Sequence, residues 1–254
     1  MAWLNRIGLL LIVLAGSGCA VPIISERELE LQSDAEFQKM RNQMVESRDA
    51  RVIAYVQCVS DAILAEVNEP YAGLAWEVVV FDDAAVNAFA LPGGHIGVFT
   101  GLLKVAENQD QLAAVIGHEV AHVTERHSYE QVNRQVTTQG AIYAGTAVLG
   151  GSQTTYDLLS MGAQIGLTLP FGRGAESEAD VVGLRYMAEA GFDPRASVQL
   201  WKNMDAEGGA SPPEFLSTHP SSSTRISGLI AQLPEALDEF NAARAGGKRP
   251  ACRP

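Results

Sequence analysis

The sequence predicts a mainly helical α+β fold in which a small β-sheet lies next to a helix that carries the motif H-E-x-x-H. The chain has 254 residues, of which 47% are hydrophobic, and this is enough for one well-buried domain. Apolar residues recur at helical spacing before and after a short region of β-branched runs at 75–103. Strands and helices do not alternate as they do in a parallel sheet, and we find no internal repeat.

Residues 1–18 are predicted to be a signal peptide that is not part of the fold. One basic residue, Arg6, precedes an apolar run that ends in small residues directly before Cys19. The stretch AGSGC resembles the lipobox of bacterial lipoproteins, although Gly16 stands where that motif usually has leucine. We therefore expect a lipid on Cys19; an ordinary cleaved signal peptide is the alternative, and both predict an exported chain. Ala20 after the cysteine resembles the sorting signal for the outer membrane of Gram-negative bacteria.

The first half of the remaining chain is predicted to hold two helices and the sheet. Residues 19–47 contain the anchor and a polar surface helix, and a domain follows over residues 48–235. A helix over 50–67 places valine and isoleucine at three- and four-residue spacing. The run at 75–83 predicts a short strand, and NAFALPGGHIGVFTGLL at 87–103 predicts two strands joined by Pro-Gly-Gly.

The second half is predicted to be helical. The helix with the motif runs from Asn108 to about Gln131, and small apolar residues at 140–170 predict buried or lipid-contacting helices broken at Gly150–Gly151. A further strong helix covers 175–191, with one apolar stripe formed by Val181, Leu184, Met187 and Ala188. The next helix begins at Asp193, residues 211–220 form a loop, and a last helix over 221–233 precedes a frayed tail at 236–254.

Charge and cysteine content restrict the partners and the compartment. The formal net charge is −12, and Lys248–Arg249 is the only Lys/Arg block outside the signal peptide. Nucleic acid is therefore not expected as a partner, because phosphate binding needs a basic surface. With a lipid on Cys19, two cysteines remain, Cys58 and Cys252. In an oxidising compartment such a pair predicts a disulfide from the tail to an early helix, with two separate thiols as the alternative.

His118 and His122 form the core of a predicted zinc site. They are four residues apart on a predicted helix, about 40° apart around its axis, so that both rings project to one side. Two imidazoles in this arrangement can share one zinc ion. Glu119 points about 100° away from His118 and is better placed to take a proton from a water on the metal than to bind it. We expect one zinc ion per chain and Glu119 as general base; incidental histidines on a solvated helix are the alternative.

A third histidine, His127, follows nine residues after His118. Metzincins use a third histidine ten residues after the first, reached through a glycine, and Glu125 stands in the place of that glycine. On a continuous helix nine residues turn through about 900°, which puts His127 opposite His118. We therefore predict that His127 is a surface or helix-terminal residue and not a ligand.

The third ligand is expected from the helix that contains RGAESEAD. A carboxylate is the usual third ligand in zinc peptidases of the His₂Glu type. Glu176 and Asp180 lie on one face at a spacing of four, whereas Glu178 is turned away by about 200°. We predict Glu176 as the ligand and Asp180 as the acceptor for the free N–H of a ligating histidine. The alternative is an acidic first turn that the helix dipole favours.

Four stretches together resemble one family of gluzincin metallopeptidases. They are NAFALPGGHIGVFTGLL, IGHEVAHVTERH, ESEADVVGLRYMAEAGFDP and STHPSSSTRI, which cover about residues 25–235 in order. The family includes HtpX, the CAAX prenyl proteases and Oma1, and the likeness is greatest to periplasmic lipoprotein members that are BepA-like or LoiP-like. The resemblance implies a zincin-like fold, zinc held by His118, His122 and Glu176, and Glu119 as the base.

The resemblance also assigns roles that the residues alone do not. His219 and Arg225 match the family's histidine–arginine pair near the site, where the histidine stabilises the oxyanion or caps the zinc as a fourth ligand. The implied function is a zinc endopeptidase at the periplasmic face of the outer membrane that cuts unfolded or misassembled proteins. An assembly or chaperone-like lipoprotein with a latent zinc site is the rival reading. An edge strand from Phe89–Leu91 or Gly97–Phe99 would bind the substrate backbone.

Overall fold

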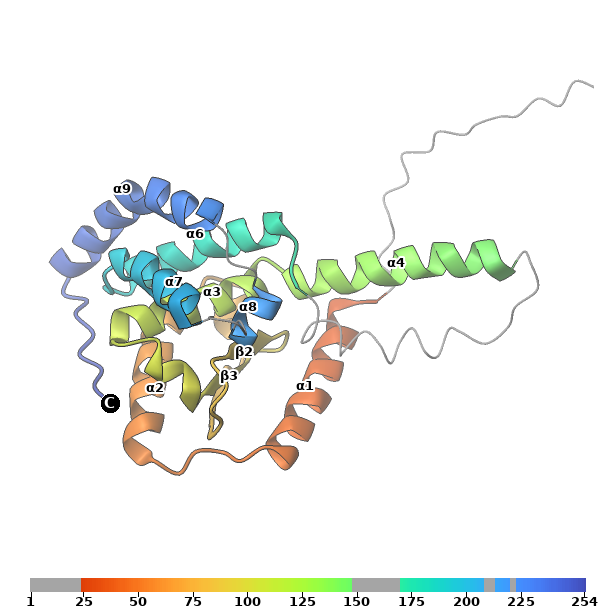
Figure 1. The fold of residues 1–254 in the computed structure, drawn as a ribbon, viewed down its shortest axis with the longest axis horizontal. Helices are drawn as coiled ribbons and strands as arrows, with labels where there is room; N and C mark the ends of the chain where they lie inside the picture. The colour runs from red at the N-terminus through yellow and green to blue at the C-terminus, as the bar shows by residue number, and fades with distance from the viewer. Residues whose placement is uncertain (1–23, 148–169, 208–212, 220–222) are drawn as a thin grey trace, which may run out of the picture.

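Helices surround a three-stranded sheet in the computed structural model, which describes residues 24–147, 170–207, 213–219 and 223–254 (Figure 1). The predicted signal peptide, Cys19 and the predicted break at Gly150–Gly151 lie outside the described residues. The mainly helical α+β fold with a small sheet is confirmed. Among the described helices, none combines the length and the apolar character that crossing a membrane requires.

The sheet has the order β1-β3-β2, so that β3 is central and β2 is an edge. Strands β2 (Ala88–Leu91) and β3 (His95–Phe99) form the predicted antiparallel hairpin. Its turn contains Gly93 and Gly94 at φ +95° and +92°, a backbone conformation that glycine adopts without strain. Strand β1 (Glu77–Phe81) pairs with β3 in parallel, which the hydrophobic pattern did not reveal. The sheet is therefore mixed.

Helix α3 (Gln109–Thr124) runs through the centre of the core. Every residue from Gln111 to Val123 is buried. Its first turn is capped by Asn108, whose side chain accepts hydrogen bonds from the backbone N–H groups of Asp110 and Gln111. Helices α2 (Ala50–Leu64), α6 (Arg173–Glu189) and α7 (Arg195–Glu207) pack around α3, as does the edge strand β2. A helix enclosed in this way can hold several side chains in fixed positions.

The closest helix packing in the described core is between α3 and α6, at Gly117 and Gly183. A Cβ atom on Gly183 would lie 2.7 Å from the backbone nitrogen of His118, and one on Gly117 would lie 2.8 Å from the carbonyl oxygen of Gly183. Real Cβ atoms essentially never approach other atoms so closely, so glycine is required on both helices. This contact brings the first turns of α6 next to the H-E-x-x-H motif.

Helix α1 (Glu26–Gln43) lies along the sheet. Ser25 and Glu28 form a capping box at its start, in which each side chain accepts from the other residue's backbone N–H. Phe37 is fully buried in a cluster with phenylalanines of all three strands, Phe81, Phe89 and Phe99. Although its sequence is polar, α1 is therefore anchored to the sheet by one aromatic side chain. Two short 3₁₀ helices, η1 (Tyr71–Gly73) and η2 (Thr100–Lys104), complete the N-terminal half.

The structure corrects four expectations about the helices. The helix with the motif ends at Thr124 rather than near Gln131, and α4 (His127–Ala147) starts in a new direction and projects from the body (Figure 1). Val181 is 43% exposed and not part of the core stripe, since the buried face of α6 is turned toward α3. A short helix, α8 (Glu214–Thr218), occupies the predicted loop.

The fourth correction concerns the C-terminal tail. Helix α9 (Ser223–Ala245) continues through Pro234 and across the expected boundary at residue 235, so the frayed tail was wrong. The chain then returns to α3 and α2. Gln109 exchanges hydrogen bonds with Pro250 and Cys252, and a disulfide joins Cys252 to Cys58 on α2.

Candidate metal centre

Four buried side chains from three segments converge beside the sheet. His118 and His122 come from α3, Glu176 from the first turn of α6, and His219 from the residue after α8. One donor atom from each lies within 4.8 Å of all the others, and each residue is at most 6% exposed. The metal-ligand pattern expected from sequence is thus brought together, with His219 as a fourth member of the same group.

The spacing of these donors fits a metal ion. His118 Nε2 lies 3.1 Å from His122 Nε2 and 3.2 Å from His219 Nδ1, while Glu176 Oε1 lies 3.0 Å from His219 Nδ1 and 3.5 Å from His122 Nε2. Four donors placed about 2.0–2.1 Å from one zinc ion in a tetrahedron would be separated by about 3.3 Å. Three imidazoles and one carboxylate therefore have both the chemistry and the spacing for zinc.

Burial keeps the histidines in the form that binds metal. It lowers the pKa of His122 to about 3 and lowers the pKa of His118 well below its usual value, with the Arg225 cation adding to the effect at His118. Burial alone would raise the pKa of Glu176, but hydrogen bonds from His122 and His219 outweigh it and hold that pKa below its usual value. The centre thus presents neutral imidazoles and an ionised carboxylate, which are the forms that coordinate zinc.

Glu119 lies at the edge of this group. Its Oε2 accepts a hydrogen bond from the backbone N–H of Ala90 at 3.2 Å, and its Oε1 lies 3.3 Å from His219 Nε2 without a hydrogen-bond partner. Burial raises the pKa of Glu119 to about 7, although the nearby His219 opposes the rise. A carboxyl group with a pKa near neutrality can both accept and return a proton.

Arg225 and Asp180 support the group from behind. Asp180 Oδ1 lies 3.1 Å from His118 Nδ1, the acceptor position expected for it. Arg225 donates to both oxygens of Asp180 at 2.7 Å and to Glu176 Oε2 at 2.6 Å, and its guanidinium lies 3.6 Å from the centroid of the Trp201 ring. Arg225 thus cross-links the two carboxylates of α6 and holds Glu176 toward the histidines.

The expectation for His127 was wrong about its exposure and its side of the chain, although His127 does begin helix α4 and lies outside the donor group. His127 is 4% exposed, and its Nδ1 lies 3.0 Å from Nδ1 of His122. The helix on which the expectation depended ends at Thr124, and Arg126 adopts a left-handed φ of 62° that turns the chain back. No glycine or proline marks this corner, so the sequence pattern gave no signal of it.

Three aromatic residues that the sequence did not indicate enclose the histidines. Phe171 stacks on His122 with ring centroids 4.0 Å apart, and Phe215 stacks on His219 at 4.5 Å. Trp201 meets His118 edge-on at 6.1 Å. Hydrogen bonds from Phe171 N–H to the carbonyl of Thr218 and from Phe215 N–H to the carbonyl of Val86 tie these residues to α8 and to the segment just before β2. Of the three, only Phe171 could have been suspected from the sequence, because it lies just before α6, the helix that carries Glu176.

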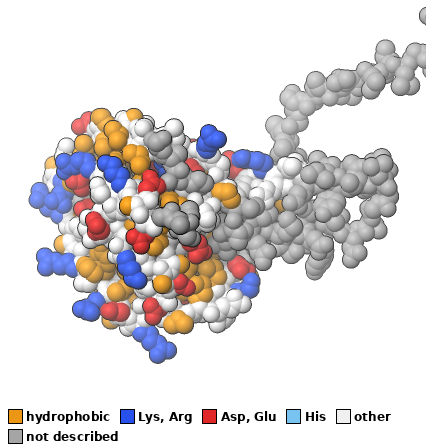
Figure 2. Space-filling view, in the orientation of Figure 1, with side chains coloured by type: hydrophobic (Ala, Val, Ile, Leu, Met, Phe, Trp, Pro, Cys, Tyr) orange, Lys and Arg blue, Asp and Glu red, His pale blue; other side chains and the backbone are white. Residues whose placement is uncertain are grey.

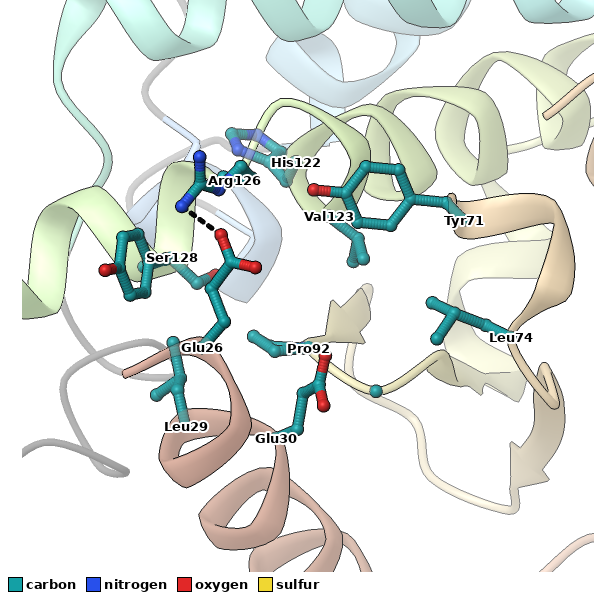
Figure 3. Close-up of a pocket in the computed structure, with 12 residues that line it drawn as sticks. Glu26, Leu29, Glu30, Tyr71, Leu74, Pro92, His122, Val123, Arg126 and Ser128 are labelled. Atoms are coloured by element: carbon teal, nitrogen blue, oxygen red, sulfur yellow. Dashed lines mark ion pairs between the residues drawn. The ribbon is translucent and has the colours of Figure 1, made fainter. Parts of the chain in front are cut away.

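Hollows adjoin the centre on several sides, and two of them reach the substrate side and the α1 side of His122. A cleft of about 1080 Å³ opens onto Glu119 and His219 and is lined by β2 and by Met40 and Met44 of α1 and its end. On the other side of His122 a pocket of about 380 Å³ lies between α1, the β2–β3 turn and the corner at Arg126. Figure 3 shows Glu26 reaching across this pocket to pair with Arg126. Only the larger cleft reaches Glu119, so it is the candidate substrate site.

Sequence comparisons agree with this geometry. The model of peptidase family M48 matches residues 50–232, which is well over half of the chain. The chain is 44% identical over 167 residues to mitochondrial metalloendopeptidase OMA1 of Schizosaccharomyces pombe, covering 64% of this chain and 48% of that protein. It is 32% identical over 222 residues to human metalloendopeptidase OMA1, covering 82% and 42%. It is 27% identical over 229 residues to the beta-barrel assembly-enhancing protease of Yersinia pestis, covering 84% and 45%. The chain thus spans less than half the length of each of these relatives.

The comparisons overturn the expected location at the periplasmic side of the outer membrane. Several relatives with higher identity, from yeasts, a plant and animals, are named as mitochondrial proteins. The short pattern around Cys19 therefore does not decide the compartment. The zinc cofactor, in contrast, is confirmed by the family and by the donor group together.

The match extends over the sheet, the H-E-x-x-H helix, the helix with Glu176 and the start of α9, and on this evidence the chain belongs to peptidase family M48.

Proposed function

We propose that this chain is a zinc endopeptidase that cuts extended, unfolded or misassembled polypeptides. The observation that carries the proposal is the meeting, in one cleft, of the metal-binding group, the Glu119 carboxylate and β2, the edge strand of the described sheet. A metal site with only a structural role has no need of a cleft at the unpaired oxygen of a buried carboxylate. We assign His118, His122 and Glu176 as the zinc ligands.

Strand β2 is the proposed binding edge for the substrate backbone. Phe99 N–H donates to the carbonyl of Asn87. Because hydrogen-bonded residues alternate along an antiparallel pair, the backbone N–H and C=O groups of Asn87, Phe89 and Leu91 point toward β3. Ala88 and Ala90 then turn their backbone groups to the other side, and Ala90 N–H indeed meets Glu119 there. An extended chain can add to this edge through backbone hydrogen bonds, which recognise an unfolded segment without reading its sequence.

The residues divide the reaction between them. His118, His122 and Glu176 would hold the zinc ion, which would supply a Lewis acid for the scissile carbonyl and lower the pKa of a water. Glu119 takes the proton of the attacking water on Oε1 and returns it to the leaving amine. Its other oxygen is held by Ala90 N–H, which directs Oε1 toward the cleft. The Phe171 and Phe215 rings stack on His122 and His219 and shield them from water, and Phe171 also lines the cleft.

Glu119→Gln tests the activity. The amide keeps the size of the side chain and its hydrogen bond from Ala90, but it cannot accept the proton. We expect cleavage of an unfolded protein such as casein to fall by at least about 100-fold, with zinc content unchanged. A variant that retains cleavage would exclude Glu119 as the base. Loss of cleavage with retained function in cells would favour an assembly factor instead.

Two observations support the alternative that the chain is an assembly factor: the name of one relative and the contact of His219 with the other donors. A relative from Yersinia pestis is named a beta-barrel assembly-enhancing protease, and His219 here lies among the donors, where it can close the metal site. We propose that His219 caps the resting site, so that His219→Ala raises basal cleavage and self-cleavage. A fall in cleavage of about 100-fold or more would instead identify His219 as the group that stabilises the oxyanion.

Lipid attachment at Cys19 stays a prediction.

A further inference from the structure

His122 has a second histidine behind it that belongs to neither the donor group nor the cleft lining. His127 Nδ1 lies 3.0 Å from His122 Nδ1, and His127 Nε2 lies 3.3 Å from Glu178 Oε2. The His127 side chain is buried, whereas the Glu178 side chain is 58% exposed. The three side chains thus form a line from the metal centre to the protein surface.

When Nε2 of His122 binds zinc, only one arrangement of protons satisfies this line. Nε2 lies among the donors, 3.1 Å from His118 Nε2, so the proton of the neutral, metal-bound ring would be on Nδ1. That N–H donates to the lone pair on His127 Nδ1. His127 then carries its proton on Nε2 and donates it to the Glu178 carboxylate, which can only accept. Each hydrogen bond fixes the direction of the next one.

The corner between α3 and α4 makes this contact possible. The left-handed backbone of Arg126 returns the chain so that the first residue of α4 faces His122 rather than solvent. The Arg126 side chain is held from two sides, by Glu26 of α1 and by the face of the Tyr129 ring at 4.7 Å (Figure 3). The corner is thus built into the contact between α1 and α4.

We propose that His127 and Glu178 are positioning residues that fix the tautomer and the ring orientation of His122. The proposal rests on the assignment of His122 as a zinc ligand made above. His118 has the corresponding partner in Asp180, 3.1 Å from its Nδ1. Both ligand histidines on α3 then have their non-ligating nitrogen held, one by a carboxylate directly and the other through a histidine. Such partners strengthen metal binding because they hold the ring in the binding orientation.

Zinc affinity of three His127 variants tests the proposal. His127→Asn places an amide oxygen near the position of Nδ1 and keeps an acceptor for His122. His127→Leu offers no acceptor, and His127→Gln carries its oxygen too far along the side chain to reach His122. In competition with a chelator of known affinity, we expect the Leu and Gln variants to bind zinc about 10–100-fold more weakly than wild type. The zinc affinity of the Asn variant should stay within about threefold of the wild-type value. The zinc affinity of Glu178→Gln, which keeps an acceptor for His127, should also stay within that range.

Two controls separate positioning from folding. The neighbouring Ser128 is equally buried, and Ser128→Ala should not change zinc affinity. Urea unfolding of the metal-free proteins measures the free energy of unfolding. If His127 had a purely structural role, its variants would lower this free energy, and the Asn and Gln variants would not differ in zinc affinity. Wild-type affinity in the Leu and Gln variants, or equal weakening in all three, would overturn the proposal. A wild-type protein that fails to bind zinc would instead refute the ligand assignment, and one that binds zinc without cleaving casein would refute the proposed activity.

The cleft lining carries a second, independent inference about substrate choice. Its larger apolar side chains are Met40, Met44, Phe89, Phe99 and Phe171, and its carboxylates are Glu36, Asp83, Glu214 and Glu119. None of the described residues that line it is Lys or Arg, although Glu36 pairs with Lys39 at 3.0 Å. Glu119 adds a buried oxygen without a hydrogen-bond partner on the same surface. The cleft thus combines apolar walls with a lining that has carboxylates and neither Lys nor Arg.

Helix α1 contributes the part of this lining that lies outside the residues matched by the family model. Glu36 and Met40 are on α1 and Met44 ends it, whereas the family match begins at residue 50. Methionine side chains adapt to apolar groups of different shape, and a desolvated carboxylate favours a nearby cation. From these observations we infer that the cleft selects polypeptide stretches with a bulky apolar side chain next to Lys or Arg. This inference rests on the proposed endopeptidase activity.

Three fluorogenic peptides that differ only at two adjacent positions test this selectivity: Leu-Lys, Leu-Glu and Ser-Lys. We expect Leu-Lys to have the highest kcat/KM, with an advantage over Leu-Glu that shrinks as salt is added. Met40→Ser combined with Met44→Ser should raise KM for Leu-Lys about tenfold and leave Ser-Lys within about twofold. Leu31→Ser, on the exposed side of the same helix, is the matched control and should change neither.

Equal cleavage of the three peptides would overturn the inference, as would an unchanged preference in the double Met variant. Glu36→Gln combined with Glu214→Gln should remove the advantage of Leu-Lys over Leu-Glu, and an advantage that persists would exclude the carboxylates as its cause. If the wild type cleaves none of the peptides and no casein, the endopeptidase proposal fails rather than the selectivity.

Discussion

At the scale of single residues, Arg225 determines whether the metal centre can be built. Two carboxylates, Glu176 and Asp180, are buried within one turn of each other on α6, and this arrangement is costly without a cation between them. Arg225 bonds to both and is itself buried against Trp201. It therefore compensates for the burial of the third ligand.

Arg225→Gln should accordingly destabilise the fold. The substitution leaves two buried carboxylates without their counter-charge, and the free energy of unfolding should fall by about 3–5 kcal/mol. Urea denaturation of the metal-free protein measures the change. Arg173→Gln, at the exposed start of the same helix, is the control and should change the free energy of unfolding by less than about 0.5 kcal/mol. Equal stability of the two variants would contradict this role.

Residue-level prediction succeeded where chemistry and spacing coincide. His118, His122, Glu176 and Asp180 could be grouped because helical periodicity fixes which side chains share a face. His127 could not be placed, because its position depends on one backbone angle at Arg126, a residue type that rarely adopts it. Phe171 and Phe215 also escaped prediction, since an aromatic ring against a histidine depends on tertiary contacts alone.

At the scale of elements, the crossing of α3 and α6 sets the distance between the ligands. Gly183→Ala tests this, because its Cβ would lie 2.7 Å from the backbone nitrogen of His118 and the helices would have to separate. We expect a loss of about 1–3 kcal/mol in unfolding free energy and a weaker affinity for zinc. Gly174→Ala on the same helix has open space around its Cβ and should change neither quantity appreciably. Wild-type zinc affinity in Gly183→Ala would show that the crossing tolerates a shift.

Prediction of elements was good for segments with a strong pattern and poor for their ends and partners. The hairpin followed from Pro-Gly-Gly, α6 from apolar spacing, and α7 from Asp193 as the predicted N-cap. The pairing of β1 with β3 was not apparent, because pairing between strands distant in sequence leaves no local pattern. The extension of α9 past Pro234 was missed because a proline usually ends a helix.

At the scale of the whole molecule, the disulfide closes almost the entire described fold into one loop. Cys58 and Cys252 are 194 residues apart in sequence. Loop-closure entropy predicts that Cys252→Ser lowers the unfolding free energy by about 3–5 kcal/mol. Cys58→Ser and the double variant should lose the same amount, since each removes the same cross-link. Thermal unfolding of the three variants checks the equality, and an additive loss in the double variant would show that the thiols stabilise the fold separately.

The surface and the compartment were the least predictable features of the whole molecule. Acidic and basic side chains are interspersed with hydrophobic ones on the described part of the visible face (Figure 2). The location was mispredicted because a signal of a few residues around Cys19 is read by cellular machinery and not by the fold. Fold physics does not constrain such a signal, whereas it constrains every residue around His118.

The order of the four donors along the chain has a consequence for synthesis. His118 and His122 leave the ribosome first, Glu176 follows, and His219 comes only after α7, with the arginine that holds Glu176 six residues later. A nascent chain therefore contains the motif long before it contains the groups that complete the centre. On the proposed endopeptidase activity, a chain becomes competent to cleave only when the last part of the domain has been made.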